Sequence, residues 1–307
     1  MRKRMPKSLN ALIAMSFPLV RLLPVKIATE LLASVFGRIS SVFLKPDTIK
    51  SNIQVAFPNL NESAVDALIV RMAANFGRHI AEIVHISTFG SGAQGTSITS
   101  EGPIDVPFEL QGPAIYIGAH LGSWELIPLV FQRHSRPLTI MYSQIDHPLL
   151  DRLFLSQRQK TGGKYVEKNE ALKACLKAMQ KGESVALLVD QRVDAGVEVD
   201  FFGRPSIFTP LPARLARRFN CPIIPCEAVR VAPGHLQVTF HAPIWPSTER
   251  GVQTDVELTQ EMARAIEDSI RRNVDTWFCN KRRWANQEKA HSSSTQDEML
   301  EAIANRP

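Results

Sequence analysis

A histidine and an acid five residues apart are the residues of this sequence best suited to acid–base chemistry. They are His120 and Glu125, in the segment GAHLGSWE at residues 118–125. A histidine can take a proton from a hydroxyl near neutral pH, and a carboxylate can fix its tautomer and stabilise its charged form. On one continuous helix the two side chains would point about 140° apart, so they can face each other only across a turn. A loop histidine followed by a solvated first-turn acid would show the same spacing.

The residues around this pair predict a strand, a turn and a helix. The apolar run at 114–117 is bounded by Gly112-Pro113 and by Gly118, which favours a short buried strand. Small residues follow, and Ser123 is a good N-cap type, so a helix is expected to begin near it. His120 is therefore predicted just past the carboxyl end of a strand, at the sheet edge where α/β proteins bind their ligands.

Strand and helix patterns alternate along the rest of the chain, which predicts an α/β fold. The expected architecture is a mixed, mostly parallel sheet covered by helices on both faces. Residues 89–103, rich in Gly, Ser and Thr, are expected to form a loop or a short excursion to the first strand. Helices are predicted at 61–87, 148–160, 170–181, 209–219 and 254–274, and strands at 138–142, 185–189, 221–231 and 236–240.

Composition is that of a globular protein with a full core. The 307 residues suffice for one large α/β domain or a domain with an appendage. Hydrophobic residues make up 44% and charged residues 21%. No GxGxxG or Walker sequence is present, so no cofactor is expected. The four cysteines form no CxxC pair and no ligand-spaced cluster with histidine, which predicts buried reduced thiols and no metal site. They are Cys175, Cys221, Cys226 and Cys279.

The net charge of +6 comes from basic residues gathered at 2–7, 214–218 and 271–283. Such clusters suit nucleic acid, phospholipid head groups or an acidic protein, although most are simply solvated faces. Aromatic and basic residues do not interleave as in RNA-binding proteins, and no zinc-finger or helix-turn-helix signature is present. Nucleic acid is therefore the least favoured of the three partners, and none is expected.

The N-terminal segment is predicted to associate with a membrane. Prolines and charges interrupt the apolar stretch at 9–23, so no run reaches the roughly 18–20 apolar residues that a span needs. An apolar stripe at helical spacing follows over 27–39. A helix lying on a membrane and a helix packed on its own domain both fit this pattern, and the basic start favours an anionic cytoplasmic leaflet. The expected organisation is a membrane-associating segment at 1–44, an α/β domain at 45–286 and a polar tail at 287–307.

Two further places carry polar side chains suited to a site. Asp190 and Gln191 follow the predicted strand at 185–189, where Asp190 could orient a base, bind a polar acceptor or cap the following turn. Arg158 and Lys160 end the predicted helix at 148–160. They are suited to bind phosphate if that helix end borders the cleft.

The sequence also suggests an apolar slot and a reaction without a covalent enzyme intermediate. Phe201, Phe202 and Gly203 follow a polar loop and could line a slot, although buried loop anchors have the same composition. Ser123 lies in no GxSxG-type elbow, so a serine nucleophile is not expected. Attack by an acceptor hydroxyl that His120 activates is therefore favoured over a covalent enzyme intermediate.

The segment GAHLGSWE is close to the GHFGNWE form of a known family. With its His-x₄-acid signature the chain resembles the bacterial lipid A biosynthesis (late) acyltransferases, within the lysophospholipid acyltransferase-like superfamily. Further blocks follow in the family's order over roughly residues 45–285. They are the N-terminal blocks at 52–58 and 75–78, the PLLD…R-x-K segment at 148–160, the DQ…FFG…T block at 190–209 and the closing W…RRW block at 277–284.

The resemblance implies a glycerolipid-acyltransferase-like fold and an acyl transfer. The donor would be an acyl-carrier-protein thioester or acyl-CoA, and the acceptor a hydroxyl of a membrane glycolipid, a lipid A precursor. The protein would work peripherally or monotopically at the cytoplasmic face of the bacterial inner membrane. His120 would be the general base, Glu125 its orienting acid, and Arg158 a candidate to stabilise the oxyanion. The expected substrate-binding residues are Arg158, Lys160, Asp190, Gln191, Phe202 and Gly203.

Three departures from the family pattern concern the acceptor more than the reaction. Ser143 stands where many members have arginine, Lys160 stands for an arginine, and Lys281 replaces a histidine. The acceptor could therefore be another lipid, such as an aminolipid or a polyene-linked lipid. A non-catalytic lipid- or carrier-binding protein of the same fold, and a hydrolase that uses water, are the remaining alternatives.

Overall fold

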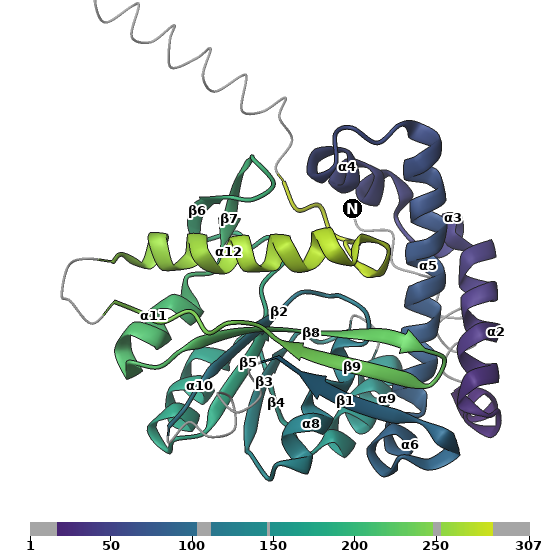
Figure 1. Ribbon diagram of the computed structural model, residues 1–307, viewed down its shortest axis with the longest axis horizontal. Coiled ribbons are helices and arrows are strands. Elements are labelled where there is room, and N and C mark those ends of the chain that lie inside the picture. The colour runs from purple at the N-terminus through teal and green to yellow at the C-terminus, as the bar shows by residue number, and fades with distance from the viewer. Residues whose placement is uncertain (1–16, 103–111, 146–147, 248–252, 285–307) are drawn as a thin grey trace, which may run out of the picture.

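A seven-stranded sheet of order β1-β9-β8-β2-β5-β3-β4 lies at the centre of the molecule (Figure 1). The computed structural model describes residues 17–102, 112–145, 148–247 and 253–284. The strands from β8 to β4 run parallel, whereas β9 is antiparallel to β8 and carries β1 parallel to itself. The prediction of a mixed, mostly parallel sheet is confirmed. The strands are β1 Ser97–Glu101, β2 Ile115–Gly118, β3 Leu138–Tyr142, β4 Lys164–Glu167, β5 Ser184–Leu188, β8 Ile223–Ala232 and β9 His235–Phe240.

Helices cover both faces of this sheet, as predicted. On β2, the side chains of Ile115 and Ile117 join a core with the helices α10, α11 and α12, whereas Tyr116 joins a second core with α6 and α8. This division follows from the alternation of side chains along a strand. The helices are α2 Val25–Arg38, α3 Ser40–Phe43, α4 Pro46–Ala56, α5 Glu62–Val84, α6 Ile86–Ser91, α8 Pro128–Arg133, α9 Pro148–Arg158, α10 Ala171–Gln180, α11 Leu211–Phe219 and α12 Asp255–Arg272.

The two longest helices begin at the caps that the sequence predicts. The Asn61 side chain accepts a hydrogen bond from the Ala64 N–H and opens α5. Thr254 and Glu257 form a reciprocal capping box that opens α12. Each cap gives partners to amide groups that the first helical turn leaves unpaired.

Four short strands, β1, β4, β6 and β7, have no predicted strand of their own. The expected loop at 89–103 contains the end of α6 and the strand β1. The strand β4 lies at the sheet edge and pairs only with β3, so it lacks the apolar run of a buried strand. A separate hairpin of β6 Val197–Asp200 and β7 Pro205–Phe208 precedes α11. Short or edge strands bury little surface, which leaves a weak sequence signal.

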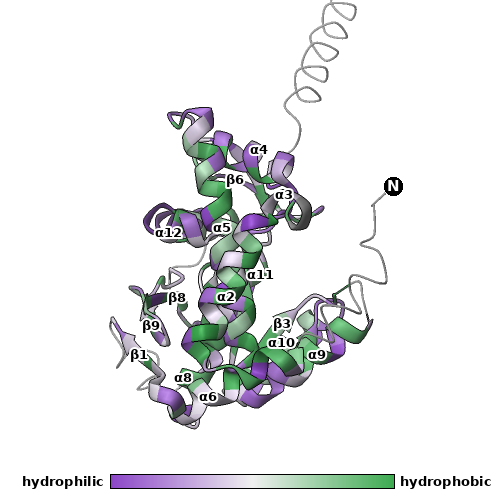
Figure 2. Ribbon diagram, turned by 90° about the vertical axis from the view of Figure 1, so that its right-hand side faces the viewer, coloured by the Kyte–Doolittle hydropathy of each residue, from purple (hydrophilic) through white to green (hydrophobic). Residues whose placement is uncertain are grey.

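The helix α2 packs lengthwise on α5 and leaves an apolar row exposed. A Cβ at Gly77 would lie 2.4 Å from the backbone oxygen of Leu32, so the close approach of the two helices requires glycine there. Figure 2 looks onto α2, which forms the outer flank of the molecule. The expectation of a helix packed on its own domain is confirmed, and contact with a membrane stays a prediction. The outward apolar side chains of α2 and its C-cap are Ile27, Leu31, Val35 and Ile39, which are 39–55% exposed.

None of the helices in the described ranges is long and apolar enough to cross a bilayer. Residues 1–16, part of the predicted membrane-associating segment, lie outside the described residues, and so does the predicted tail at 287–307.

Candidate active site

His120 and Asp190 meet because two neighbouring parallel strands end in register. Gly118 at the end of β2 pairs with Leu188 at the end of β5. His120 and Asp190 each follow two residues after these strand ends. His120 Nδ1 lies 2.7 Å from Asp190 Oδ1. The indole N–H of Trp277 donates to the other carboxylate oxygen, Oδ2, at 3.0 Å. Asp190, only 2% exposed, is therefore held at both oxygens.

The surroundings of Asp190 keep it ionised. Burial alone would raise the pKa of this carboxyl, but the charge of His120 and the hydrogen bonds from His120 and Trp277 outweigh it and hold the pKa below its usual range. An ionised carboxylate can only accept, so Nδ1 of His120 carries the hydrogen of their bond. In the neutral imidazole, Nε2 is then left with its lone pair, which is the form a general base needs.

Gln191, held by Lys281, contacts the second ring nitrogen of His120, Nε2. The Gln191 Nε2 lies 3.2 Å from His120 Nε2, and the Lys281 ammonium donates to Gln191 Oε1 at 2.7 Å. An ammonium has only donors, so Oε1 must face Lys281 and the amide NH₂ must face the histidine. Gln191 therefore donates towards Nε2 of His120 on the side of the ring opposite Asp190.

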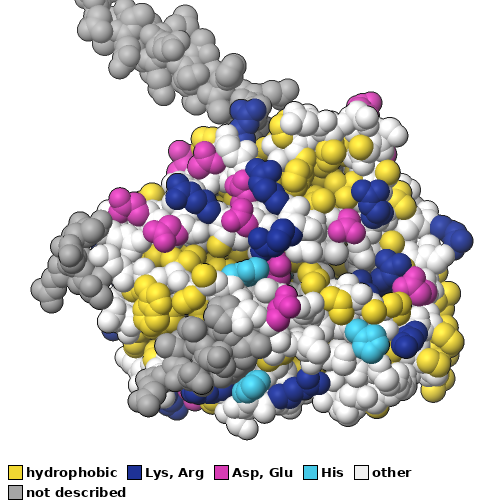
Figure 3. All heavy atoms as spheres, in the orientation of Figure 1, with side chains coloured by type: hydrophobic (Ala, Val, Ile, Leu, Met, Phe, Trp, Pro, Cys, Tyr) yellow, Lys and Arg dark blue, Asp and Glu magenta, His cyan; other side chains and the backbone are white. Residues whose placement is uncertain are grey.

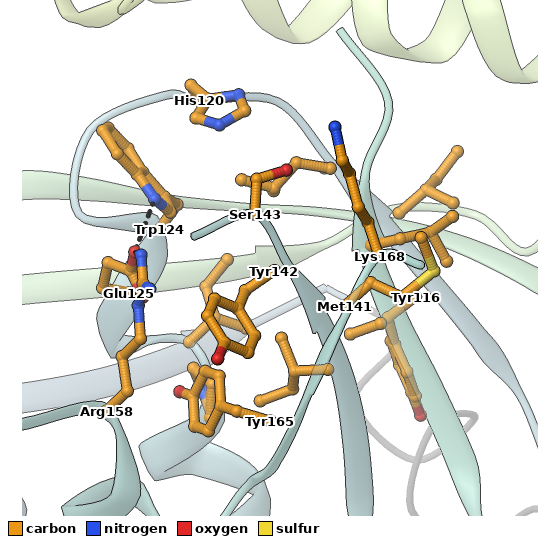
Figure 4. Close-up of a pocket in the computed structure, with 18 of the residues that line it drawn as sticks. Tyr116, His120, Trp124, Glu125, Met141, Tyr142, Ser143, Arg158, Tyr165 and Lys168 are labelled. Atoms are coloured by element: carbon orange, nitrogen blue, oxygen red, sulfur yellow. Dashed lines mark hydrogen bonds and ion pairs between the residues drawn. The ribbon is translucent and has the colours of Figure 1, made fainter. Parts of the chain in front are cut away.

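Glu125 does not orient His120. The hydrogen bond predicted for it is made by Asp190, and Glu125 forms a two-pronged ion pair with Arg158. Arg158 Nε lies 2.9 Å from Oε2 and Nη2 lies 2.5 Å from Oε1. Glu125 lies within a short helical turn, Trp124–Leu126, and points towards Arg158 (Figure 4). Burial would lower the pKa of Arg158, but the charge and hydrogen bonds of Glu125, together with the charges of Tyr165 and Asp151, outweigh it and raise that pKa.

Three other predicted site residues lie outside the pocket around His120. Lys160 donates to Gln157 Oε1 at 2.7 Å and is not among the described residues that line the pocket. Phe202 and Gly203 are not among them either, so the expectation that they line the slot is wrong for this pocket. Phe202 is buried, and its ring stacks with that of Trp277, with centroids 6.3 Å apart. Its contact with the site is therefore indirect, through the indole that holds Asp190.

An apolar pocket of about 330 Å³ extends from His120 into the second core. Figure 4 shows His120 at one end and Tyr116 at the other, with Met141 and Tyr142 between them. Ala186 of β5 stands between Tyr116 of β2 and Ile140 of β3 in the sheet register. The Ala186 side chain is only a methyl group, so it leaves space between these two larger side chains. The pocket is thus a slot on one sheet face, with the base at its polar end.

A buried ion pair holds the loop that carries His120. The Ser123 hydroxyl donates to Glu82 Oε2, and Arg230 Nε lies 2.6 Å from Glu82 Oε1. Glu82 is fully buried on α5, and Arg230 comes from β8. The preceding Gly122 has φ of +55°, and a Cβ there would lie 2.1 Å from a backbone oxygen of β8. The loop is thus fixed to a helix and to a strand.

The contacts of Glu82, Arg230 and Ser123 were not predicted from the sequence. Ser123 was expected to cap a helix, but its hydroxyl makes no cap hydrogen bond. A detectable signal for Glu82 was present, because this acid stands beside Ile83 on the apolar face of α5. A buried acid requires a partner, and the partner here is supplied by a distant strand.

The four cysteines are free and buried, as predicted. Burial raises the pKa of each thiol, to about 11 for Cys175 and about 12 for Cys221. Thiols held in this form are poor nucleophiles. Over the described ranges, no group of three or more His, Cys, Asp or Glu side chains is arranged to hold a metal ion.

The fold and the site define an α/β protein with a histidine–carboxylate pair at the carboxyl edge of its sheet, above an apolar slot. Residues 2–286 match the family described as bacterial lipid A biosynthesis acyltransferase, and the chain belongs to this family. It is similar to a lipid A biosynthesis acyltransferase of Haemophilus influenzae, with 31% identity over 99 residues. That match covers 32% of this chain and 31% of the relative, so it spans about a third of either protein.

Proposed function

We propose that this protein transfers a fatty acyl chain from a thioester donor to a hydroxyl of a membrane glycolipid, a lipid A precursor. The observation that carries the proposal is the His120–Asp190 pair at the polar end of an apolar slot, in a member of this family. The donor is acyl-carrier protein or acyl-CoA, and the reaction needs no cofactor, because a histidine base and an activated ester suffice for acyl transfer.

The geometry supports a direct transfer. His120 Nε2 takes the proton of the acceptor hydroxyl while its oxygen attacks the thioester carbonyl carbon. Ionised Asp190 stabilises the imidazolium that forms, as the buried acid does in hydrolase triads. The tetrahedral intermediate then collapses with cleavage of the carbon–sulfur bond, and the imidazolium returns the proton to sulfur. The products are an ester and a free thiol, and no acyl-enzyme forms.

Arg158 can donate a hydrogen bond to the proposed substrate. Its Nε and Nη2 hold Glu125, whereas Nη1 is buried without a hydrogen-bond partner among the described residues. Arg158 and Glu125 both line the pocket. A donor left unpaired in a site is suited to an oxygen of the substrate, such as the developing oxyanion or a phosphate. Glu125 would act by fixing this guanidinium.

The exposed row on α2 supports a position on the membrane surface. Four apolar side chains at helical spacing face outward on a helix whose other face is buried against α5. Such a helix can insert its apolar side chains into the boundary between head groups and acyl chains. We place the protein on the cytoplasmic face of the inner membrane, where a lipid acceptor reaches the site from the bilayer.

The proposal is tested by incubating the purified full chain in mixed micelles with acyl-carrier-protein and acyl-CoA donors. The acceptors are a lipid A precursor, an aminolipid and a polyene-linked lipid, and mass spectrometry identifies the products. We expect an acylated lipid A precursor with wild type and none with His120→Ala. Acylation of another lipid alone would reassign the acceptor. Release of free fatty acid alone would indicate a hydrolase, and no turnover of any donor would contradict an enzymatic function.

A further inference from the structure

A second hollow, of about 590 Å³, lies between the helices α10 and α11. Leucines of both helices form its apolar floor, and Leu172 remains 56% exposed there. We call this hollow the α10–α11 groove. Its residues are Leu172, Leu176, Ala195, Gly196, Thr209, Pro210, Leu211, Arg214, Leu215 and Arg218.

The two helices that form the groove carry only positive charge. The sequence of α10, ALKACLKAMQ, has two lysines and no acid, and that of α11, LPARLARRF, has three arginines and no acid. One carboxylate, Asp255, pairs with both Arg214 and Arg217. Within the described part of the chain, no carboxylate pairs with Arg218 or with the two lysines of α10. An apolar floor with a positive rim is complementary to an acidic amphipathic helix.

Two stretches of chain connect this groove to the active site. On the first, Lys168 lines the pocket of His120 and Leu172 lines the groove. On the second, Gln191 lines the pocket and Ala195 lines the groove. Four residues of fully extended chain span at most about 14 Å, so the groove opens close to the pocket. A protein seated there could reach the pocket with a flexible thioester arm.

The groove and the apolar row of α2 lie on opposite flanks of the molecule. In Figure 1, α10 and α11 lie at the lower left and α2 at the right, and in Figure 2, α2 is in front with α11 behind it. A membrane bound along α2 therefore leaves the groove open to the solvent. On the face seen in Figure 3, basic and acidic side chains are interspersed, so that face offers no continuous basic surface to compete.

The geometry points to the α10–α11 groove as the docking site for an acidic helix of the acyl carrier protein that delivers the acyl chain. This inference rests on the proposed function and names the surface that recognises the donor. Leu172 and its neighbours would receive the apolar side chains of the helix. Arg218, with the lysines of α10, would pair with its carboxylates. The charges would guide the encounter, and the apolar contacts would set the lifetime of the complex.

The test compares two donors with the same dodecanoyl chain, one on acyl carrier protein and one on free pantetheine. The variants are Arg218→Glu and Leu172→Asp in the full chain. For the carrier-bound donor we expect KM to rise on the order of tenfold, which corresponds to about 1.4 kcal/mol. For the pantetheine donor, which does not reach the groove, we expect kcat/KM to stay within about twofold of wild type. Added salt should raise the carrier KM of wild type more than that of Arg218→Glu.

The matched control is Arg264→Glu, the same charge reversal at an exposed position of α12. This variant should have the KM and kcat/KM of wild type with both donors. An unchanged carrier KM in both groove variants, or an equal loss with both donors, would overturn the docking site. Loss of binding to anionic phosphatidylglycerol vesicles with an unchanged carrier KM would assign the groove to a membrane instead. Failure of wild type with both donors would contradict the proposed function and not the groove alone.

Discussion

At the scale of single residues, the chemistry depends on where the proton of His120 sits. Asp190 holds the hydrogen on Nδ1, and Trp277 holds Asp190 in place. An asparagine at this position could turn its NH₂ towards the ring and favour the opposite tautomer, which would leave no lone pair on Nε2.

We therefore expect Asp190→Asn to lower kcat on the order of 10²- to 10⁴-fold with little change in KM. Steady-state kinetics with the carrier-bound donor measure both constants. The matched control is Asp200→Asn, an exposed aspartate on β6, which should behave as wild type. A wild-type kcat in Asp190→Asn would rule out the proposed tautomer control.

The same carboxyl links folding stability to pH. The folded state holds the pKa of Asp190 below its usual range, so at low pH the unfolded chain binds this proton more readily than the folded chain. Its contribution is present above the ordinary aspartate pKa of about 3.9 and is lost as pH falls through the lower folded value. Urea midpoints of wild type should fall between about pH 5 and pH 3, and those of Asp190→Asn should fall less steeply. An equal slope in both proteins would contradict this linkage.

The ion pair between Glu125 and Arg158 should matter for stability as well as for activity. Glu125→Gln leaves a guanidinium that is 11% exposed without its counter-charge. Breaking a buried pair in this way costs roughly 3–5 kcal/mol. Thermal unfolding should show the loss, and kcat should fall because Arg158 is no longer fixed. The control is Glu183→Gln, whose partner Lys164 is largely exposed, and it should change stability by less than about 1 kcal/mol. Equal losses in the two variants would contradict a special role for the buried pair.

At the scale of elements, the loop after β2 is positioned by contacts far away in sequence. Glu82 of α5 and Arg230 of β8 hold Ser123, three residues after the base. A loop held in this way would keep His120 at a fixed distance from the substrate that we propose, and small displacements of a catalytic group cost much rate.

Ser123→Ala removes one donor from the fully buried Glu82. We expect a loss of stability of about 1–3 kcal/mol and a fall in kcat on the order of tenfold, with KM nearly unchanged. A merely structural contact would lower stability and leave the kcat of the folded protein unchanged. The control is Ser156→Ala, an exposed serine on α9 that should change neither quantity.

Which elements form was largely predictable, and which side chains meet was not. The strand before His120 and the strand before Asp190 were both predicted, because their apolar runs are short and clearly bounded. That these two strands are neighbours in the sheet was not predicted, since two other strands lie between them along the chain. Glu125 was expected to orient His120 because of its spacing and the family resemblance, whereas orienting a base was one of three roles considered for Asp190. The actual partner, Asp190, is 70 residues away.

At the scale of the whole molecule, the two flanks of the protein serve two different partners in our proposals. The apolar row of α2 faces the lipid, and the α10–α11 groove faces the carrier protein. The His120–Asp190 pair follows the ends of β2 and β5 in the central sheet, and in our proposals donor and acceptor meet there.

The membrane contact can be tested without deleting α2, whose inner face is part of the core. We expect the triple substitution Ile27→Glu, Leu31→Glu and Val35→Glu to lower partitioning into anionic vesicles by more than about tenfold, since each removes apolar surface and adds a like charge. Vesicle co-sedimentation measures this change. Val256→Glu, at an exposed apolar position on α12, is the control and should bind as wild type. Unchanged binding of the triple variant would exclude α2 as the membrane contact.

The sequence by itself determined the α/β class, the main helix caps and the two strand ends that carry His120 and Asp190, because periodicity, caps and buried runs are local properties. The tertiary structure alone decided the site: that Asp190 holds His120, that Glu125 holds Arg158, and that Glu82 and Arg230 fix the loop. These contacts join residues from separate elements, and strand order and register bring them together. No spacing along the chain encodes that order.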